Sequence, residues 1–178
     1  MLSAQAGLHR FVWDLHYPRP AVLRFSYPIA AIYRNTPVMP VGPWALPGRY
    51  TVKLSVDGTT ITQPLTVKMD PRVKTLAAEL ERQSRLSMKL YELLRQDFAA
   101  LAEVQAFRAD ARNVVLEGDA AGVESTLTRL NGQHGSLYRS VESADVAPTS
   151  QVVEAIGTLE RALGDALAQW EELKSRGG

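Results

Sequence analysis

Proline and glutamate are distributed unequally along the chain, and this distribution sharply limits the folds that it can adopt. Nine of the 10 prolines lie at or before Pro71, and no glutamate precedes Glu79. Proline interrupts helices, whereas glutamate favours helices over strands. Residues 1–72 carry eight Lys or Arg and three Asp, net +5; residues 73–178 carry twelve Lys or Arg and sixteen acids, net −4. The sequence therefore predicts an α+β chain, with a β-type domain over 1–72 and a helical domain over 73–178.

A β-hairpin is the clearest local prediction in the first half of the chain. Apolar side chains occupy every second position of residues 50–56, and residues 60–68 alternate similarly, which is typical of half-buried strands. Asp57-Gly58 between them suits a tight turn, because glycine accepts a positive φ. Pro64 lacks an N–H group and therefore belongs at a sheet edge or a bulge.

Two further strands are expected upstream, at Phe11–Leu15 and within residues 22–32. Together with the hairpin they predict a small antiparallel β-sandwich-like domain. Four or five strands are fewer than the seven of a full sandwich. Either the sheet packs on the helices, or strands supplied from elsewhere complete it.

Leucine spacing predicts three amphipathic helices in the second half, over about residues 75–117, 120–142 and 151–174. Thr75 is the expected cap of the first helix, and Gly118 and Asp119 are expected to separate the first helix from the second. The segment from Ala147 to Ser150 is expected to separate the second from the third. Short links predict an antiparallel three-helix bundle. The excess length of the first helix must then lie against the β half or a partner chain.

Composition narrows the classes of function. The chain has no cysteine, which excludes disulfides, thiol nucleophiles and thiolate metal sites. A net charge of +1 gives no global field for nucleic acid or for an anionic membrane, and no apolar run is long enough to span a bilayer. The N-terminus lacks the pattern of a signal peptide, so the sequence as written predicts a cytoplasmic protein.

His9, Asp14 and His16 are the candidate catalytic or metal-ligating residues. In a strand Asp14 and His16 share a face and could act as an acid–base pair or bind a divalent cation such as calcium. The alternative, a polar outer face opposite Phe11 and Trp13, is favoured because spacing fixes no third ligand. The sequence thus predicts no cofactor. His134, next to a glycine, is expected to be solvated.

Signatures of other chemistry are missing from the sequence. It contains no G-x-S-x-G, S-x-x-K, H-E-x-x-H, Walker or dinucleotide pattern. The acidic residues of the helical half alternate with Lys and Arg, as on solvated helix faces. Arginines interleaved with aromatic residues in the β half suit stacking on bases or sugars, but an aromatic core with a basic rim is the favoured interpretation.

Four segments resemble a known family: residues 7–18 (GLHRFVWDLHYP), 42–54 (GPWALPGRYTVKL), 63–72 (QPLTVKMDPR) and 143–149 (SADVAPT). Their order is similar to that in the C-terminal region of bacterial BNR-repeat, sialidase-like propeller proteins, often labelled glycosyl hydrolase or photosystem-assembly-like. The resemblance implies an immunoglobulin-like domain followed by a helical tail, in a periplasmic or secreted setting. No propeller residue is present here, so a catalytic role of a propeller is not carried over.

The leading functional hypothesis is therefore a non-catalytic accessory module. It would associate with a propeller domain, or form a homo-oligomer through the long first helix. The alternative is a small hydrolase of ester, lactone or glycosidic bonds that depends on a divalent cation near His9, Asp14 and His16. Binding of nucleic acid or carbohydrate by the β half is a third class, and no nucleic-acid or membrane partner is expected.

Overall fold

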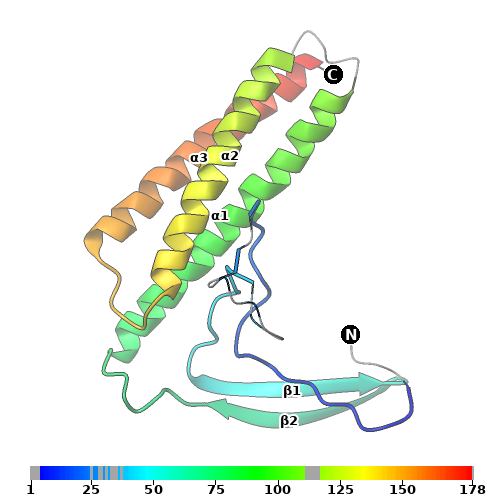
Figure 1. Ribbon diagram of the computed structural model, residues 1–178, viewed down its shortest axis with the longest axis vertical. Coiled ribbons are helices and arrows are strands. Elements are labelled where there is room, and N and C mark those ends of the chain that lie inside the picture. Colours follow the sequence, from blue (N-terminus) through cyan, green and yellow to red (C-terminus); the bar gives the residue numbers. More distant parts are fainter. Residues whose placement is uncertain are drawn as a thin grey trace.

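The computed structural model describes residues 5–24, 26–27, 30, 32, 36, 38–110 and 117–177. It is an α+β structure with two strands and three helices in the order β1 (Gly48–Val56), β2 (Thr59–Val67), α1 (Ala77–Ala109), α2 (Glu117–Glu142) and α3 (Ser150–Gly177). Figure 1 shows the helices lying side by side, with α2 running opposite to α1 and α3, and the strands extending away from the end where α1 begins. The expected α+β class is confirmed.

The predicted hairpin is confirmed, and it forms the whole sheet of the described residues. β1 and β2 pair antiparallel from Gly48↔Val67 to Val56↔Thr59, which leaves Asp57 and Gly58 as a two-residue turn. Both turn residues have positive φ, 48° and 78°, as this tight connection requires. No residue of either strand is fully buried, so the expectation of half-buried strands is wrong for most of the hairpin.

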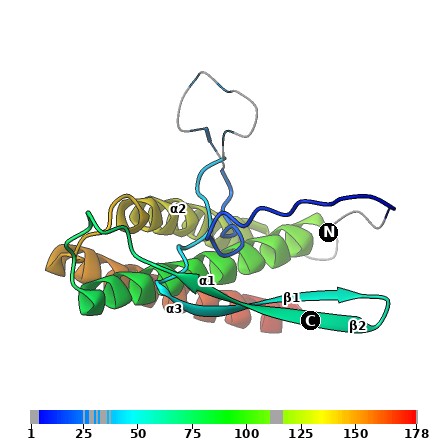
Figure 2. The ribbon, with the colours of Figure 1, turned by 90° about the horizontal axis from the view of Figure 1, so that it is seen from below.

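The sandwich expected for residues 1–72 is not shown. Phe11–Leu15 forms no strand, and Leu15 has a φ of 64°, which ends the alternation. Figure 2 shows the dark blue N-terminal segment lying apart from the two strands. Of the strand expected within residues 22–32, some positions lie outside the described residues, and Ser26 forms an isolated bridge with Met39.

The three helices occur where leucine spacing placed them, with different ends. α1 stops at Ala109 instead of about residue 117, and Glu117 begins α2. Gly118 and Asp119, expected between helices, lie inside α2. Leu76, not Thr75, precedes α1 without a side-chain cap, and the Thr75 hydroxyl donates to the carbonyl of Asp145 instead. Helix ends depend on such tertiary contacts as well as on local propensity.

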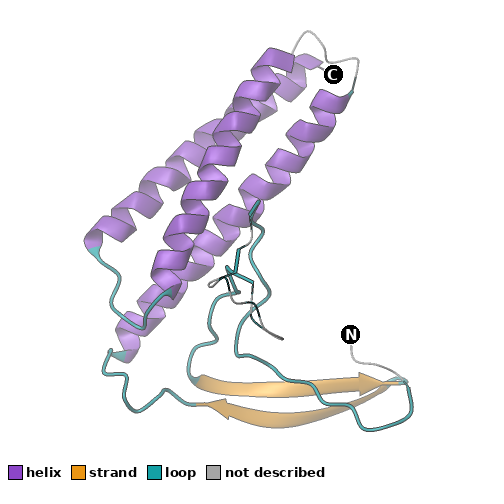
Figure 3. Ribbon diagram, in the orientation of Figure 1, coloured by secondary structure: helices purple, strands orange, loops and turns teal. Residues whose placement is uncertain are grey.

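The main core lies between the helices. Its fully buried members come from all three and include Leu94, Leu127, Leu163 and Trp170, and Val22 is the one buried member that the described residues before β1 contribute. Trp170 packs edge-on against Phe107, with ring centroids 5.3 Å apart, and its indole N–H donates to Glu103. The helical half therefore buries its own apolar surface, whereas the orange hairpin in Figure 3 contributes nothing to this core.

Candidate functional site

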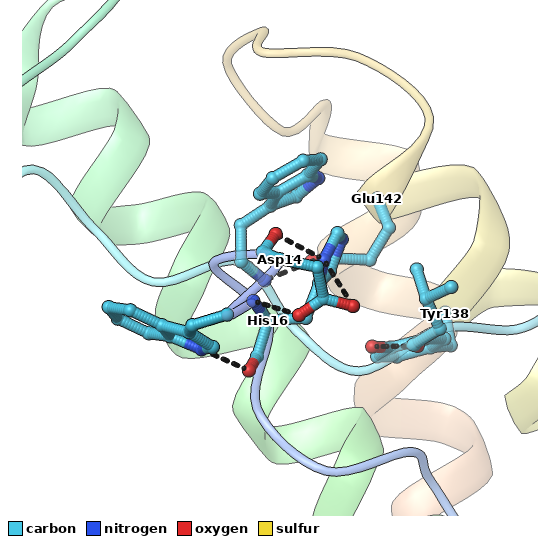
Figure 4. A network of polar contacts seen from close by, with 7 residues as sticks. Asp14, His16, Tyr138 and Glu142 are labelled. Carbon is cyan, nitrogen blue, oxygen red and sulfur yellow. Dashed lines mark hydrogen bonds and ion pairs between the residues drawn. The ribbon is translucent and has the colours of Figure 1, made fainter. Parts of the chain in front are cut away.

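Asp14 and His16 meet through a local turn, not through a shared strand face. Leu15 adopts a positive φ, which brings the His16 N–H to 3.1 Å from Asp14 Oδ1 and His16 Nδ1 to 3.0 Å from the Asp14 carbonyl. The distance from His16 Nδ1 to Asp14 Oδ2 is 3.7 Å. Figure 4 shows the imidazole of His16 between Asp14 and Glu142. The structure thus joins two of the three candidate residues, by a geometry that the spacing did not predict.

His9 does not join this pair. Its Nε2 lies 2.6 Å from the carbonyl of Gln5, four residues earlier, and the contact is exposed. In the described part of the chain, no three His, Asp, Glu or Cys side chains converge in a way that could hold a metal ion. The arrangement of His9, Asp14 and His16 as a three-residue site is therefore not assembled by the fold.

The segment around His16 is fastened to the loop before β1. The Tyr17 N–H donates to Pro43, and the Ala45 N–H donates to Leu15, each at 2.8 Å. The rings of His16 and Trp44 lie 3.7 Å apart between centroids. These bonds hold His16 against Trp44. In this position His16 Nε2 is buried, and it has no hydrogen-bond partner among the described residues.

Glu142, at the end of α2, is the functional candidate that sequence reasoning missed. Its carboxylate accepts the Ser87 hydroxyl and, at 3.3 Å, the backbone N–H of Trp44. Burial raises the pKa of Glu142, and the bonds from Ser87 and Trp44, together with the nearby His16, oppose that rise. Glu142 lies four residues after the buried Tyr138, on the apolar stripe of α2. This helical spacing is the sequence signal that could have indicated the burial of Glu142.

A pocket of about 450 Å³ lies at the junction of the hairpin base with α1 and the end of α2. We call it the junction pocket. Its polar lining includes Glu142, Asp145, Gln83 and Ser84, and its apolar lining includes Trp44. Its size falls within the range of small-molecule sites. Among the described residues that line it there is no histidine, so its serines have no imidazole base within the pocket.

A second polar cluster is enclosed between α1 and α2. Asp97 Oδ2 lies 2.8 Å from His134 Nδ1, and Asp97 Oδ1 accepts the Asn131 side-chain amide at 2.6 Å. Neither Asp97 nor His134 has exposed side-chain surface. The expectation that His134 is solvated is wrong, because its position four residues after the buried Leu130 places it on the packed side of α2.

This cluster holds the N-terminal segment against the helices. Asn131 Oδ1 accepts the Leu23 N–H at 3.0 Å, and Asn131 Nδ2 is 3.4 Å from the carbonyl of Ala21. Val22, between these two residues, is buried in the core. Burial raises the pKa of Asp97, and the bonds from His134 and Asn131 oppose that rise. The arrangement positions a segment of chain and gives the imidazole no access to a substrate.

The outer two thirds of the hairpin form an exposed apolar surface, which we call the hairpin face. Its members lie on one side of the two strands and are 47–59% exposed: Val52, Leu54, Val56 and Ile61. Only the base of the hairpin is covered, where Tyr50 meets Trp13 with ring centroids 5.6 Å apart. A contiguous apolar face on a two-stranded sheet is typical of a surface that another protein layer covers.

Comparison with protein-family models, with curated proteins and with solved structures finds no match to this chain. No described helix combines the length and the apolar character that crossing a membrane requires.

Proposed function

We propose that the chain is a non-catalytic association module in which the helices carry the hairpin as a docking arm. The hairpin would pair with β structure of another domain, such as the propeller that the sequence resemblance implies or a second copy of this chain. The exposed hairpin face is the observation that carries this proposal, because four large apolar side chains on two strands remain about half exposed.

The expected stability of the hairpin supports a role in association. A two-stranded sheet in water is marginally stable by itself, and independent stability usually needs a third strand or a covering layer. Burying each of Val52, Leu54, Val56 and Ile61 against a partner would add on the order of 1 kcal/mol, since about half of each side chain is available. The helices need no such help, because their apolar stripes already meet in one core.

The finer fold follows from the same proposal. The two strands would form part of an immunoglobulin-like sandwich whose remaining strands come from the partner, and the three helices would act as an antiparallel bundle that supports it. This arrangement accounts for a β-rich sequence over residues 1–72 of which only β1 and β2 pair as strands among the described residues.

Hydrolysis of a glycosidic bond is the second candidate, and the junction pocket favours it. Glu142 and Asp145 both line this pocket, and burial raises the pKa of Glu142, as befits a general acid. Both oxygens of Glu142, however, already accept hydrogen bonds from Ser87 and Trp44. We therefore rank this activity, and cleavage of esters or lactones, below association.

Hydrogen exchange on the full chain tests the association proposal. With the chain shown to be monomeric by sedimentation, the amides of α1, α2 and α3 should be protected, whereas those of β1 and β2 should exchange with little protection. Strong protection of the hairpin in the monomer would overturn the proposal, because the sheet would then need no partner.

Enzyme assays on a panel of substrates test the same proposal by looking for catalysis. The chain should not hydrolyse chromogenic glycosides, esters or lactones, with or without calcium. Turnover that is lost in Glu142→Gln, or in Asp14→Ala, and retained in the exposed-site variant Glu154→Gln would replace association by catalysis.

A further inference from the structure

The two edges of the hairpin are not equivalent. In a hairpin with a two-residue turn, the residues that flank the turn form a hydrogen-bonded pair, and such pairs recur at every second position. With Val56↔Thr59 as that first pair, the even-numbered residues of β1 bond to β2. The N–H and C=O groups of the odd-numbered residues of β1 therefore point away from β2: Arg49, Thr51, Lys53 and Ser55.

Pro64 makes the outer edge of β2 less able to pair with another strand. Pro64 pairs with Thr51, a position at which the backbone N–H would point outward from β2, and proline has none. The outer edge of β2 thus has a gap in its row of donors, whereas every residue on the outer edge of β1 has an N–H group. The sheet of the described residues ends at both edges, with no third strand. β1 is consequently the edge that can accept another strand along its whole length.

The charges along β1 specify what kind of strand fits. Arg49 and Lys53 lie on the polar face of the sheet, four residues apart, and neither strand contains an acidic residue. In a strand paired with β1, the residues opposite Arg49 and Lys53 would also be four positions apart. Opposite charges across a strand pair stabilise it, and like charges directly opposite destabilise it. Apolar residues of the added strand would lie opposite Tyr50 and Val52.

The chain itself cannot supply such a strand. No two of its 19 acidic residues are separated by four positions. The β1 strand of a second copy would bring a second Arg49 and Lys53 to the same polar face instead of carboxylates. Charge complementarity therefore favours a different polypeptide over a second copy.

We infer that the outer edge of β1 captures an extended segment of another protein, in which two acidic residues four positions apart flank an apolar–any–apolar triplet. The segment would add to the sheet as a third strand, with its carboxylates beside Arg49 and Lys53 and its apolar side chains continuing the hairpin face. This inference rests on the proposed association function and names the class of partner.

A synthetic peptide tests the inference. The probe is a capped nine-residue peptide in which two glutamates flank a Val-Thr-Val segment, titrated into the ¹⁵N-labelled full chain. The backbone amides of Arg49, Thr51 and Lys53 should shift and gain protection, while outward amides of β2 such as that of Thr62 should not. The same peptide with lysines in place of glutamates should bind about tenfold more weakly.

Matched proline variants separate the two edges. Thr51→Pro removes an outward N–H from β1 and should abolish peptide binding, whereas Thr62→Pro removes an outward N–H from β2 and should leave it intact. Neither residue donates to the ladder within the hairpin, so both variants should fold, and circular dichroism is the check on this. The double variant Arg49→Glu with Lys53→Glu should reverse the preference, so that the lysine peptide binds better.

Each contrary result is informative. Shifts on β2, an unaffected Thr51→Pro variant, equal affinity for the two peptides, or no binding at millimolar peptide would overturn the inference. If the peptide fails while the hairpin of the monomer remains unprotected and the chain inactive, the association proposal stands without this partner. If the hairpin is strongly protected in the monomer, the association proposal itself fails.

Discussion

Asp97 and His134 form a hydrogen-bonded pair inside the helical half, with 2.8 Å between Oδ2 and Nδ1 and no exposed side-chain surface on either residue. A charged or strongly polar pair in such a place is costly unless its partners satisfy it. Asn131 satisfies the other oxygen of Asp97 and also bonds to the backbone at Ala21 and Leu23. The cluster thus links the N-terminal segment to α1 and α2.

Asp97→Ala should lower the free energy of unfolding by about 3–5 kcal/mol, because it leaves the buried Nδ1 of His134 without its partner and removes the nearer acceptor of the Asn131 amide. Urea denaturation measures the loss. The matched control is Asp165→Ala on the exposed side of α3, which should change the free energy by less than about 0.5 kcal/mol. Equal effects of the two variants would contradict the structural role of the cluster.

Glu142→Gln should flatten the pH dependence of stability. Burial raises the pKa of Glu142, so the folded chain binds this proton more tightly than the unfolded chain does. The contribution is complete below the ordinary carboxyl pKa and is lost as pH rises through the raised pKa. Between about pH 4 and neutrality the wild-type chain should therefore lose stability relative to Glu142→Gln.

Denaturation profiles over that pH range measure this difference. Glu154→Gln, at an exposed position of α3, serves as the control and should follow the wild-type profile. If wild type and Glu142→Gln keep a constant separation at every pH, the burial of this carboxylate does not control its ionisation.

Gly42→Ala should disrupt the contact between the His16 turn and the loop before β1. A methyl group on residue 42 would overlap the backbone carbonyl oxygen of Tyr17, which cannot move aside without breaking the bond between Tyr17 and Pro43. The expected loss of stability is about 1–3 kcal/mol, with a shift of the Trp44 indole resonance.

Gly132→Ala is the matched control for that substitution. A methyl group there meets nothing within 4 Å, on an exposed side of α2. Alanine favours helix over glycine, so this variant should gain up to about 1 kcal/mol. A tolerated Gly42→Ala would show that the two segments are not held together as tightly as their hydrogen bonds indicate.

The double variant Val52→Thr with Ile61→Thr should leave the stability of the helical half within about 0.5 kcal/mol of wild type, because both side chains are exposed. It should, however, reduce the fluorescence of an apolar dye that binds the hairpin face. Leu94→Ala gives the contrast, with an expected loss of about 2–5 kcal/mol from the buried core. Unchanged dye binding in the double variant would argue against an accessible hairpin face.

Local patterns predicted the elements whose periodicity is complete within one segment. The hairpin register follows from alternation about Asp57-Gly58, and the three helices follow from the spacing of leucines along each. Predictions that needed contacts between segments were less successful. Phe11–Leu15 alternates as a strand does, yet the chain turns at Leu15. Two backbone hydrogen bonds with the loop before β1, one from Tyr17 to Pro43 and one from Ala45 to Leu15, hold that turn.

The same division applies to the candidate sites. The closeness of His9, Asp14 and His16 in the sequence makes them candidates, but only Asp14 and His16 meet. The sequence predicts a solvated His134 and does not single out Glu142, although their helical spacing from Leu130 and Tyr138 places both on the packed side of α2. Charge in a sequence predicts solvation on average, whereas burial of a particular carboxylate or imidazole depends on which residues of other segments reach it.

The division into a proline-rich β segment and three helices can be predicted from the sequence, because turn chemistry and helical or alternating periodicity act over a few residues. Contacts between distant segments, by contrast, leave the hairpin outside the core, bind Asn131 to the chain at Ala21 and Leu23, and bring the backbone N–H of Trp44 to the Glu142 carboxylate. The contacts of Asn131 and Glu142 join residues about a hundred positions apart. Their free energy comes from packing and desolvation between segments, which no local pattern encodes.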